Sequence, residues 1–220
     1  MEKRTSPGNR QKKDNPFEPK GLAGSICVML HDMVCILAVI VVGFVLAARL
    51  VGVSGRSMYP TLVGGESDDA MGDYLVLRSN FLRSSYEQGD IVVACVPSFE
   101  NGKPIVKRVV AVGGQTVSFR KGTDGFLHVY VDGILQAEDK INEPMQARFN
   151  AVDGYEAVVP ENCYFLMGDN RNNSTDSRAP DVGMVDGRYI VGKALWLILP
   201  GQDAWKNYSR DWSRIGDVYD

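Results

Sequence analysis

An uninterrupted apolar run near the start of the chain constrains the fold more than any other feature. It begins at Met33 and continues without a charged residue to Ala48, just before Arg49. If the long side chain of Arg49 snorkels to the interface, a helix can continue to Val53 and reach about twenty residues, which is enough to cross a bilayer. The sequence therefore predicts one transmembrane helix, a signal anchor assigned to residues 25–53.

Basic residues before this run give the span an orientation. Residues 1–24 are polar, contain three prolines and carry more basic than acidic side chains, as in a disordered tail. Because the positive flank of a single span stays inside, we expect a cytoplasmic tail and an extracytoplasmic remainder. A cleavable signal peptide ending at Ala47-Ala48 is the competing interpretation. Cleavage there would leave Ser57 close to a new, unanchored N-terminus, so a retained anchor is favoured.

Composition argues against several classes of function. The 220 residues are 45% hydrophobic and 23% charged, as in a folded chain, and the net charge of -3 provides no basic field for nucleic acid. With two histidines, His31 and His128, and no CxxC pair, neither a histidine triad nor a zinc site is expected. We predict no metal and no cofactor. A disulfide between Cys95 and Cys163 remains an alternative, but two free thiols packed in the core are favoured.

Beyond the span, the pattern is typical of an all-β domain. Short apolar runs alternate with Gly, Pro, Asn and Asp, and Asp132-Gly133 is a hairpin turn signal. We expect this domain over residues 54–200, with the acidic stretch 64–73 as a solvated hairpin tip. The tail 201–220 is expected either at a membrane interface, through its aromatic residues, or frayed. The clearest strands are 74–77, 90–96, 105–112, 116–119, 127–131, 134–135, 164–167 and 189–196.

A serine and a lysine in this part of the chain could form a hydrolytic pair. Ser57 lies in Arg56–Leu62, shortly after the span, and Gly55 leaves the backbone open for an oxyanion. Lys107 lies in Ile105–Val110, with apolar neighbours two positions away on the same strand face. Desolvation there can lower a lysine pKa by about 3–5 units, so that a neutral amine could accept the serine proton. A turn serine and a sheet-edge lysine are the alternatives.

A dense polar run, Gly168–Arg178, could hold both residues in place. Ser174 could hydrogen-bond the amine of Lys107 and orient it. Asp176 could pair with Arg178 and fix the turn. An Asx-rich loop that caps a strand is the alternative interpretation.

In this order and behind an anchor, these segments resemble the bacterial type I signal peptidase family, as far as about Leu199. Ser57–Leu62 resembles the nucleophile box of the family, and Gly89–Val93 resembles its second conserved strand. Lys107–Gly114 resembles the general-base box, with the lysine of the prokaryotic and organellar branch rather than a histidine. Gly168–Arg178 resembles the last box almost throughout.

The resemblance implies a mostly β, signal-peptidase/LexA-like Ser/Lys peptidase fold with one N-terminal transmembrane helix. It implies a variable β insertion at about 114–160. Ser57 would be the nucleophile, Lys107 the general base, and Ser174 the residue that orients the lysine. The supporting residues implied are Asp169, Asp176 and Arg178.

The same resemblance indicates where a substrate would bind. Some members have a serine two positions before the nucleophile, whose hydroxyl helps to bind the oxyanion, whereas this chain has Gly55. The oxyanion hole would then rely on the backbone N–H of Ser57. The candidate residues for oxyanion and substrate binding are Gly55, Ser57, Met58 and Val106.

The function implied is removal of signal peptides from exported preproteins through an acyl-enzyme, at the outer face of a bacterial plasma membrane. The implied partners are preproteins with Ala-x-Ala cleavage sites, the lipid bilayer and, by proximity, the secretion translocon, without nucleic acid. A self-cleaving LexA-like protein is an alternative, opposed by the anchor and by the missing DNA-binding helices. The other alternative is an anchored β domain that is catalytically silent and binds exported proteins.

Overall fold

The computed structural model describes residues 21–65, 71–80 and 85–219. The chain divides into an N-terminal unit that ends at Phe44 and a β-rich unit that begins at Val45. Most of the basic tail expected over 1–24 lies outside the described residues.

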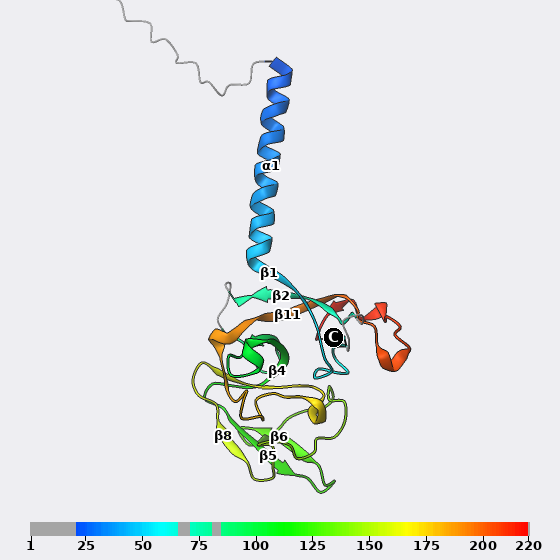
Figure 1. Cartoon of the computed structure of the whole chain (residues 1–220). Helices are drawn as coiled ribbons and strands as arrows, with labels where there is room; N and C mark the ends of the chain where they lie inside the picture. Colours follow the sequence, from blue (N-terminus) through cyan, green and yellow to red (C-terminus); the bar gives the residue numbers. More distant parts are fainter. Residues whose placement is uncertain (1–20, 66–70, 81–84, 220) are drawn as a thin grey trace, which may run out of the picture. The chain divides into compact units, whose positions relative to one another are not determined.

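The N-terminal unit carries one long helix, α1 (Gly21–Ala47, 27 residues) (Figure 1). At 1.5 Å per residue it is about 40 Å long, more than the roughly 30 Å of a hydrocarbon core. None of its residues is buried against protein, so its apolar side chains need another apolar environment. Among the described residues it is the one helix long and apolar enough to cross a membrane. The predicted fold class, mostly β with one N-terminal apolar helix, is confirmed.

The helix ends earlier than the expected span of 25–53. It stops at Ala47, and Ala48–Gly52 forms strand β1, so Arg49 lies in a strand. The cause is antiparallel pairing of all five β1 residues with β2 (Tyr74–Ser79). Valine and glycine are weak helix formers, so this pairing outweighs the local helix preference at the end of the run.

The β-rich unit contains an eight-stranded antiparallel sheet. Its order is β1-β2-β11-β3-β4-β9-β10, and β12 pairs with β11. The strands predicted in this part of the sequence are present. The short strands β10 and β12 were not predicted, because two-residue strands leave no alternating pattern. The remaining bounds are β3 (Ile91–Cys95), β4 (Pro104–Val112), β9 (Cys163–Met167), β10 (Val185–Asp186), β11 (Ile190–Leu199) and β12 (Gly216–Asp217).

A second, four-stranded sheet follows β4 and has the order β7-β6-β5-β8 (Figure 1). Its strands fall within 114–160, the stretch expected to be the insertion. Asp132 and Gly133 join β6 to β7 with positive φ angles of 51° and 77°, as a tight hairpin requires. Its core packs on β4 and β9, with Phe119 against Phe165. The bounds are β5 (Thr116–Lys121), β6 (Leu127–Val131), β7 (Ile134–Leu135) and β8 (Glu156–Val158).

The loop between β1 and β2 is fastened to the first sheet by two apolar side chains. We call residues 53–65 the serine loop. Met58 and Leu62 are each 1% exposed and belong to one core cluster with Leu75 and Leu77 of β2. Burial of Met58 and Leu62 fixes the serine loop on both sides of the turn at residues 59–61.

Residues 200–219, here called the C-terminal segment, are ordered rather than frayed. β12 pairs with β11, and the segment also forms two 3₁₀ turns. Asp73 is likewise not part of a solvated tip, because it is fully buried and paired with Arg214; residues 66–70 of that acidic stretch lie outside the described residues. The exposed rings of Trp205 and Trp212 leave the interfacial role as a prediction.

We expect Leu77→Ala to lower the free energy of unfolding by about 2–5 kcal/mol, because it leaves a cavity beneath the serine loop. Leu135→Ala is the matched control, since this leucine is 53% exposed and its loss should change stability by less than about 0.5 kcal/mol. Urea unfolding of the full chain in detergent, followed by tryptophan fluorescence, measures both. Equal effects would contradict the assigned core.

Candidate active site

The structure brings Ser57 and Lys107 together. Lys107 Nζ, on β4, lies 2.7 Å from Ser57 Oγ and 2.9 Å from the carbonyl oxygen of Val106. Ser57 is half-buried, whereas Lys107 is 3% exposed. The two residues are fifty positions apart in sequence, so only the fold makes the pair.

Burial changes the acid–base chemistry of the lysine. Desolvation lowers the pKa of Lys107 from 10.5 to about 8, although the carboxylate of Asp176 opposes the shift. The guanidinium of Arg178 lowers the pKa further. An amine with this pKa is partly neutral near pH 7 and can accept a proton from the serine hydroxyl.

A buried ion pair stands beside the lysine. Arg178 and Asp176 are both completely buried, and two guanidinium nitrogens donate to the two carboxylate oxygens at 2.8 Å. Although burial opposes it, the hydrogen bonds and charge of Arg178 hold the pKa of Asp176 below its usual range. Asp176 also accepts from the N–H of Gly168 at 2.9 Å. The lowered pKa favours the charged carboxylate, and its hydrogen bonds hold it in one position within the loop.

Ser174 does not make the bond expected of it. Its hydroxyl donates to Asp176 at 2.7 Å, and in the described part of the chain the amine of Lys107 contacts Ser57 and Val106 instead. Because the carboxylate is charged, it is the stronger acceptor for this hydroxyl. Ser174 thus joins the Asp176 cluster, and its orienting role stays a prediction.

The polar run also holds the backbone of the serine. The backbone N–H of Asn170 donates to the carbonyl oxygen of Ser57 at 3.0 Å. The side-chain amide of Asn170 donates to the carbonyl oxygen of Arg56 at 3.1 Å. A β-carbon placed on Gly168 would lie 2.3 Å from the same Ser57 oxygen, so only glycine fits there. Sequence reasoning did not single out Asn170 or Gly168, although both lie inside the motif it quoted.

A second ion pair connects the polar run to the lysine strand and to the serine loop. Arg108 forms two hydrogen bonds with Asp169, at 2.9 and 2.7 Å, and donates to the carbonyl oxygen of Gly89 at 3.0 Å. Thr61 donates its hydroxyl to the same carboxylate at 2.5 Å. Asp169 therefore supports both partners of the Ser57–Lys107 pair from one position.

An open pocket of about 410 Å³ leads to the pair. The serine loop, the residues before it and the start of β4 line it, and the lining includes Gly55, Val106 and Lys107. Met58, expected to bind oxyanion or substrate, instead has its side chain in the core. Within the described ranges, no cluster of three His, Cys, Asp or Glu side chains could hold a metal ion, and all four cysteines are free thiols.

Comparisons with known proteins identify the family of this chain. A family model described as signal peptidase, peptidase S26, matches residues 26–199. A signal peptidase I of Bacillus amyloliquefaciens is 31% identical over 207 residues, 92% of this chain and 95% of that protein. A probable signal peptidase I-1 of Synechocystis is 36% identical over 151 residues, 66% of this chain and 67% of that protein. A crystal structure of a signal peptidase I from Enterococcus faecalis, 28% identical, covers 50% of this chain and 96% of its own with a TM-score of 0.39, too low to support an argument.

The matched region includes most of α1, the serine loop, the lysine strand and the polar run. The chain therefore belongs to the signal peptidase family, peptidase S26. The family resemblance stated from the sequence is confirmed.

We expect Gly168→Ala to lower peptidase activity by about a hundredfold, because the new methyl group displaces the Ser57 backbone. Gly187→Ala is the matched control, since its β-carbon would meet its nearest atom at 3.2 Å, a contact that small shifts relieve. Steady-state cleavage of a peptide substrate by the full chain measures both. Normal activity in a folded Gly168→Ala variant would refute the close contact.

Proposed function

We propose that this chain is a membrane-anchored serine endopeptidase that removes signal peptides from exported preproteins. The observation that carries the proposal is the 2.7 Å contact between the Ser57 hydroxyl and a buried lysine of lowered pKa. Relatives named signal peptidase I, one of which covers nearly the whole chain, support the choice of substrate. A silent binding domain would have no need to hold a lysine in this costly environment.

In the proposed mechanism, neutral Lys107 accepts the proton of Ser57 while Oγ forms a bond to the scissile carbonyl carbon. The protonated amine then gives that proton to the leaving nitrogen as the C–N bond breaks, which leaves an acyl-enzyme. Lys107, neutral again, takes a proton from water as the water oxygen attacks the ester. The same proton returns to Ser57 Oγ when the acid product leaves.

The backbone N–H of Ser57 is the proposed oxyanion donor. With the described residues it forms no backbone hydrogen bond, so it can donate to a substrate oxygen. Gly55, with a φ of 72° and open space at its β-carbon position, keeps the approach clear. Asp169, Asp176 and Arg178 are proposed as supporting residues that fix the two loops.

The proposed substrate lies extended along the pocket and adds to the backbone edges near residues 53–57 and 104–107. Residues of both segments line that pocket. Shallow sites there would accept small side chains before the cut, in keeping with an Ala-x-Ala cleavage motif.

Single substitutions at the pair test this function. We expect Ser57→Ala and Lys107→Met each to abolish preprotein cleavage, because each removes one partner of the proton transfer. Matched controls are Ser98→Ala and Lys121→Met, both exposed and outside the lining of the pocket, which should keep normal rates. Cleavage by either pair variant would exclude the dyad, and no cleavage by the unmutated protein on several preproteins would favour the binding domain.

We also propose a single-pass topology in a bacterial plasma membrane, with the N-terminus cytoplasmic and the β domain outside. The apolar length of α1 supports the span, and the basic residues before it support the orientation. Outside, the domain would stand beside the bilayer and near the translocon from which preproteins emerge.

Protease added to intact spheroplasts should digest the β domain and leave an N-terminal tag protected, because the tag is inside. The tag should also remain joined to the domain before digestion, since the anchor is not cleaved. Immunoblots of both parts measure the outcome. A protected domain, or a tag already separated from it, would contradict the topology or the retained anchor.

A further inference from the structure

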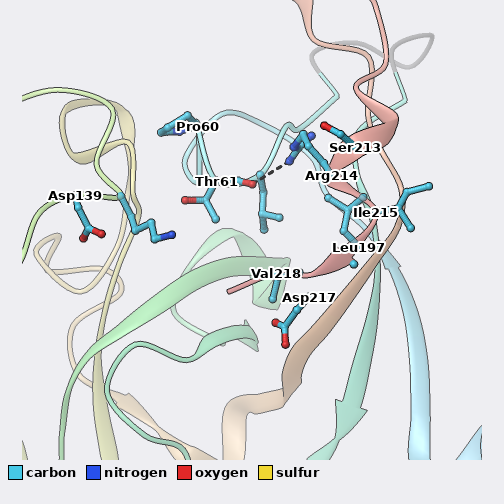
Figure 2. Close-up of a pocket in the computed structure, with 12 residues that line it drawn as sticks. Pro60, Thr61, Asp139, Leu197, Ser213, Arg214, Ile215, Asp217 and Val218 are labelled. Atoms are coloured by element: carbon cyan, nitrogen blue, oxygen red, sulfur yellow. Dashed lines mark hydrogen bonds between the residues drawn. The ribbon is translucent and has the colours of Figure 1, made fainter. Parts of the chain in front are cut away.

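Two residues of the C-terminal segment contact the serine loop. The guanidinium of Arg214 donates to the carbonyl oxygen of Thr61 at 2.9 Å, and Figure 2 shows this contact. The ring of Trp205 stacks with Tyr59 at a centroid distance of 6.3 Å and lies 4.8 Å from the guanidinium carbon of Arg56. These contacts flank the serine in sequence, one before it and two after it.

Arg214 also ties the loop to the start of β2. Its two terminal nitrogens donate to Asp73 at 3.0 and 2.7 Å. Asp73 is completely buried and accepts from the N–H groups of Val63 and Gly201 at 2.8 and 2.6 Å. One bidentate pair thus connects the serine loop, β2 and the C-terminal segment, and this fork geometry requires an arginine.

The far end of the segment is fixed to the strands around the lysine. In the pairing of β12 with β11, Asp217 lies opposite Trp196. The hydroxyl of Tyr219 donates to the carbonyl oxygen of Ala194 at 3.1 Å and accepts from the N–H of Ile91 at 2.9 Å. Ile91 opens β3, which pairs with the lysine strand β4. The segment therefore bridges the sheet of the lysine and the loop of the serine.

Apolar packing through Leu62 leaves part of this side of the loop unfilled. A cavity of about 430 Å³ is lined by Pro60–Leu62 and by the C-terminal segment, including Ile215 and Val218 (Figure 2). Side chains that border a cavity lose part of their van der Waals contacts. The polar and aromatic contacts therefore add to the burial of Met58 and Leu62 in holding the loop at this face.

We propose that the C-terminal segment is a clamp on the serine loop and that Arg214 is a positioning residue for Ser57. The proposal rests on the proposed function, in which Ser57 is the nucleophile. Misplacing a reacting atom by about 1 Å can lower a rate by about a hundredfold. Loss of the clamp therefore lowers kcat more than it changes KM, because one of the two proposed substrate edges, residues 104–107, is unchanged.

The test measures kcat and KM of the full-length protein in detergent micelles on a preprotein. Arg214→Met removes the guanidinium fork, and Arg210→Met is the matched control, because Arg210 of the same segment donates to the carbonyl of Pro200 instead. We expect Arg214→Met to lower kcat at least about tenfold with KM within about twofold, and Arg210→Met to keep both within about twofold. A folded Arg214→Met with normal kcat, or an equal loss in Arg210→Met, overturns the clamp.

Arg214→Met leaves the buried carboxylate of Asp73 without its ion-pair partner, so this variant could fail to fold. A second variant tests the proposal in that case. Trp205 is 69% exposed, so Trp205→Ala spares the core. We expect a loss of about threefold in kcat, restored by Trp205→Phe, which keeps a ring to stack. Normal kcat in Trp205→Ala overturns the proposal. Ser57→Ala in the same assay separates the two ideas, since cleavage by that variant would refute the proposed function itself.

Discussion

The rest of the site depends on one interaction, the contact between the buried amine of Lys107 and the hydroxyl of Ser57. A pKa lowered from 10.5 to about 8 means that folding forces the lysine toward its neutral form. Below pH 8 this costs about 3 kcal/mol of stability, a penalty that fades as the pH rises toward 10.5, where the unfolded lysine also loses its proton. The cost is a sizeable share of the stability of a small domain, so the surrounding structure must compensate for it.

Two ion pairs and a glycine provide that surrounding structure. Asp176 and Arg178 fix the polar run beside the lysine, and Asp169 with Arg108 joins the run to β4. Gly168 then allows this run to approach the serine backbone more closely than any side chain would permit. Under the proposed function, Ser57 and Lys107 held in this way lose little freedom on binding a substrate, which favours a fast reaction.

Sequence patterns predicted the β architecture and the apolar helix, because alternating strands and a long apolar run are local signals. They also singled out Ser57 and Lys107, which the structure brings together, while the roles of these two residues stay a prediction. These patterns failed where contacts between distant residues determine the local structure or the hydrogen-bond partner. Residues 48–52 became β1 because β2 pairs with them, and Ser174 bonds Asp176 rather than the lysine. The solvated tip expected at Asp73 and the frayed alternative for the C-terminal segment were wrong for a similar reason, since the pairing of Asp73 with Arg214 joins positions 141 residues apart. No local pattern encodes such a contact.

The most direct test of the account is the pKa of Lys107 itself. NMR of isotopically labelled lysine side chains in the full-length protein in detergent, with Lys107→Met to assign the signal, gives this value by pH titration. Lys107 is expected to titrate near pH 8, well below the ordinary lysine value of 10.5. Titration of Lys107 near 10.5, the ordinary value of a lysine, would contradict the central claim that burial makes this amine the base for Ser57.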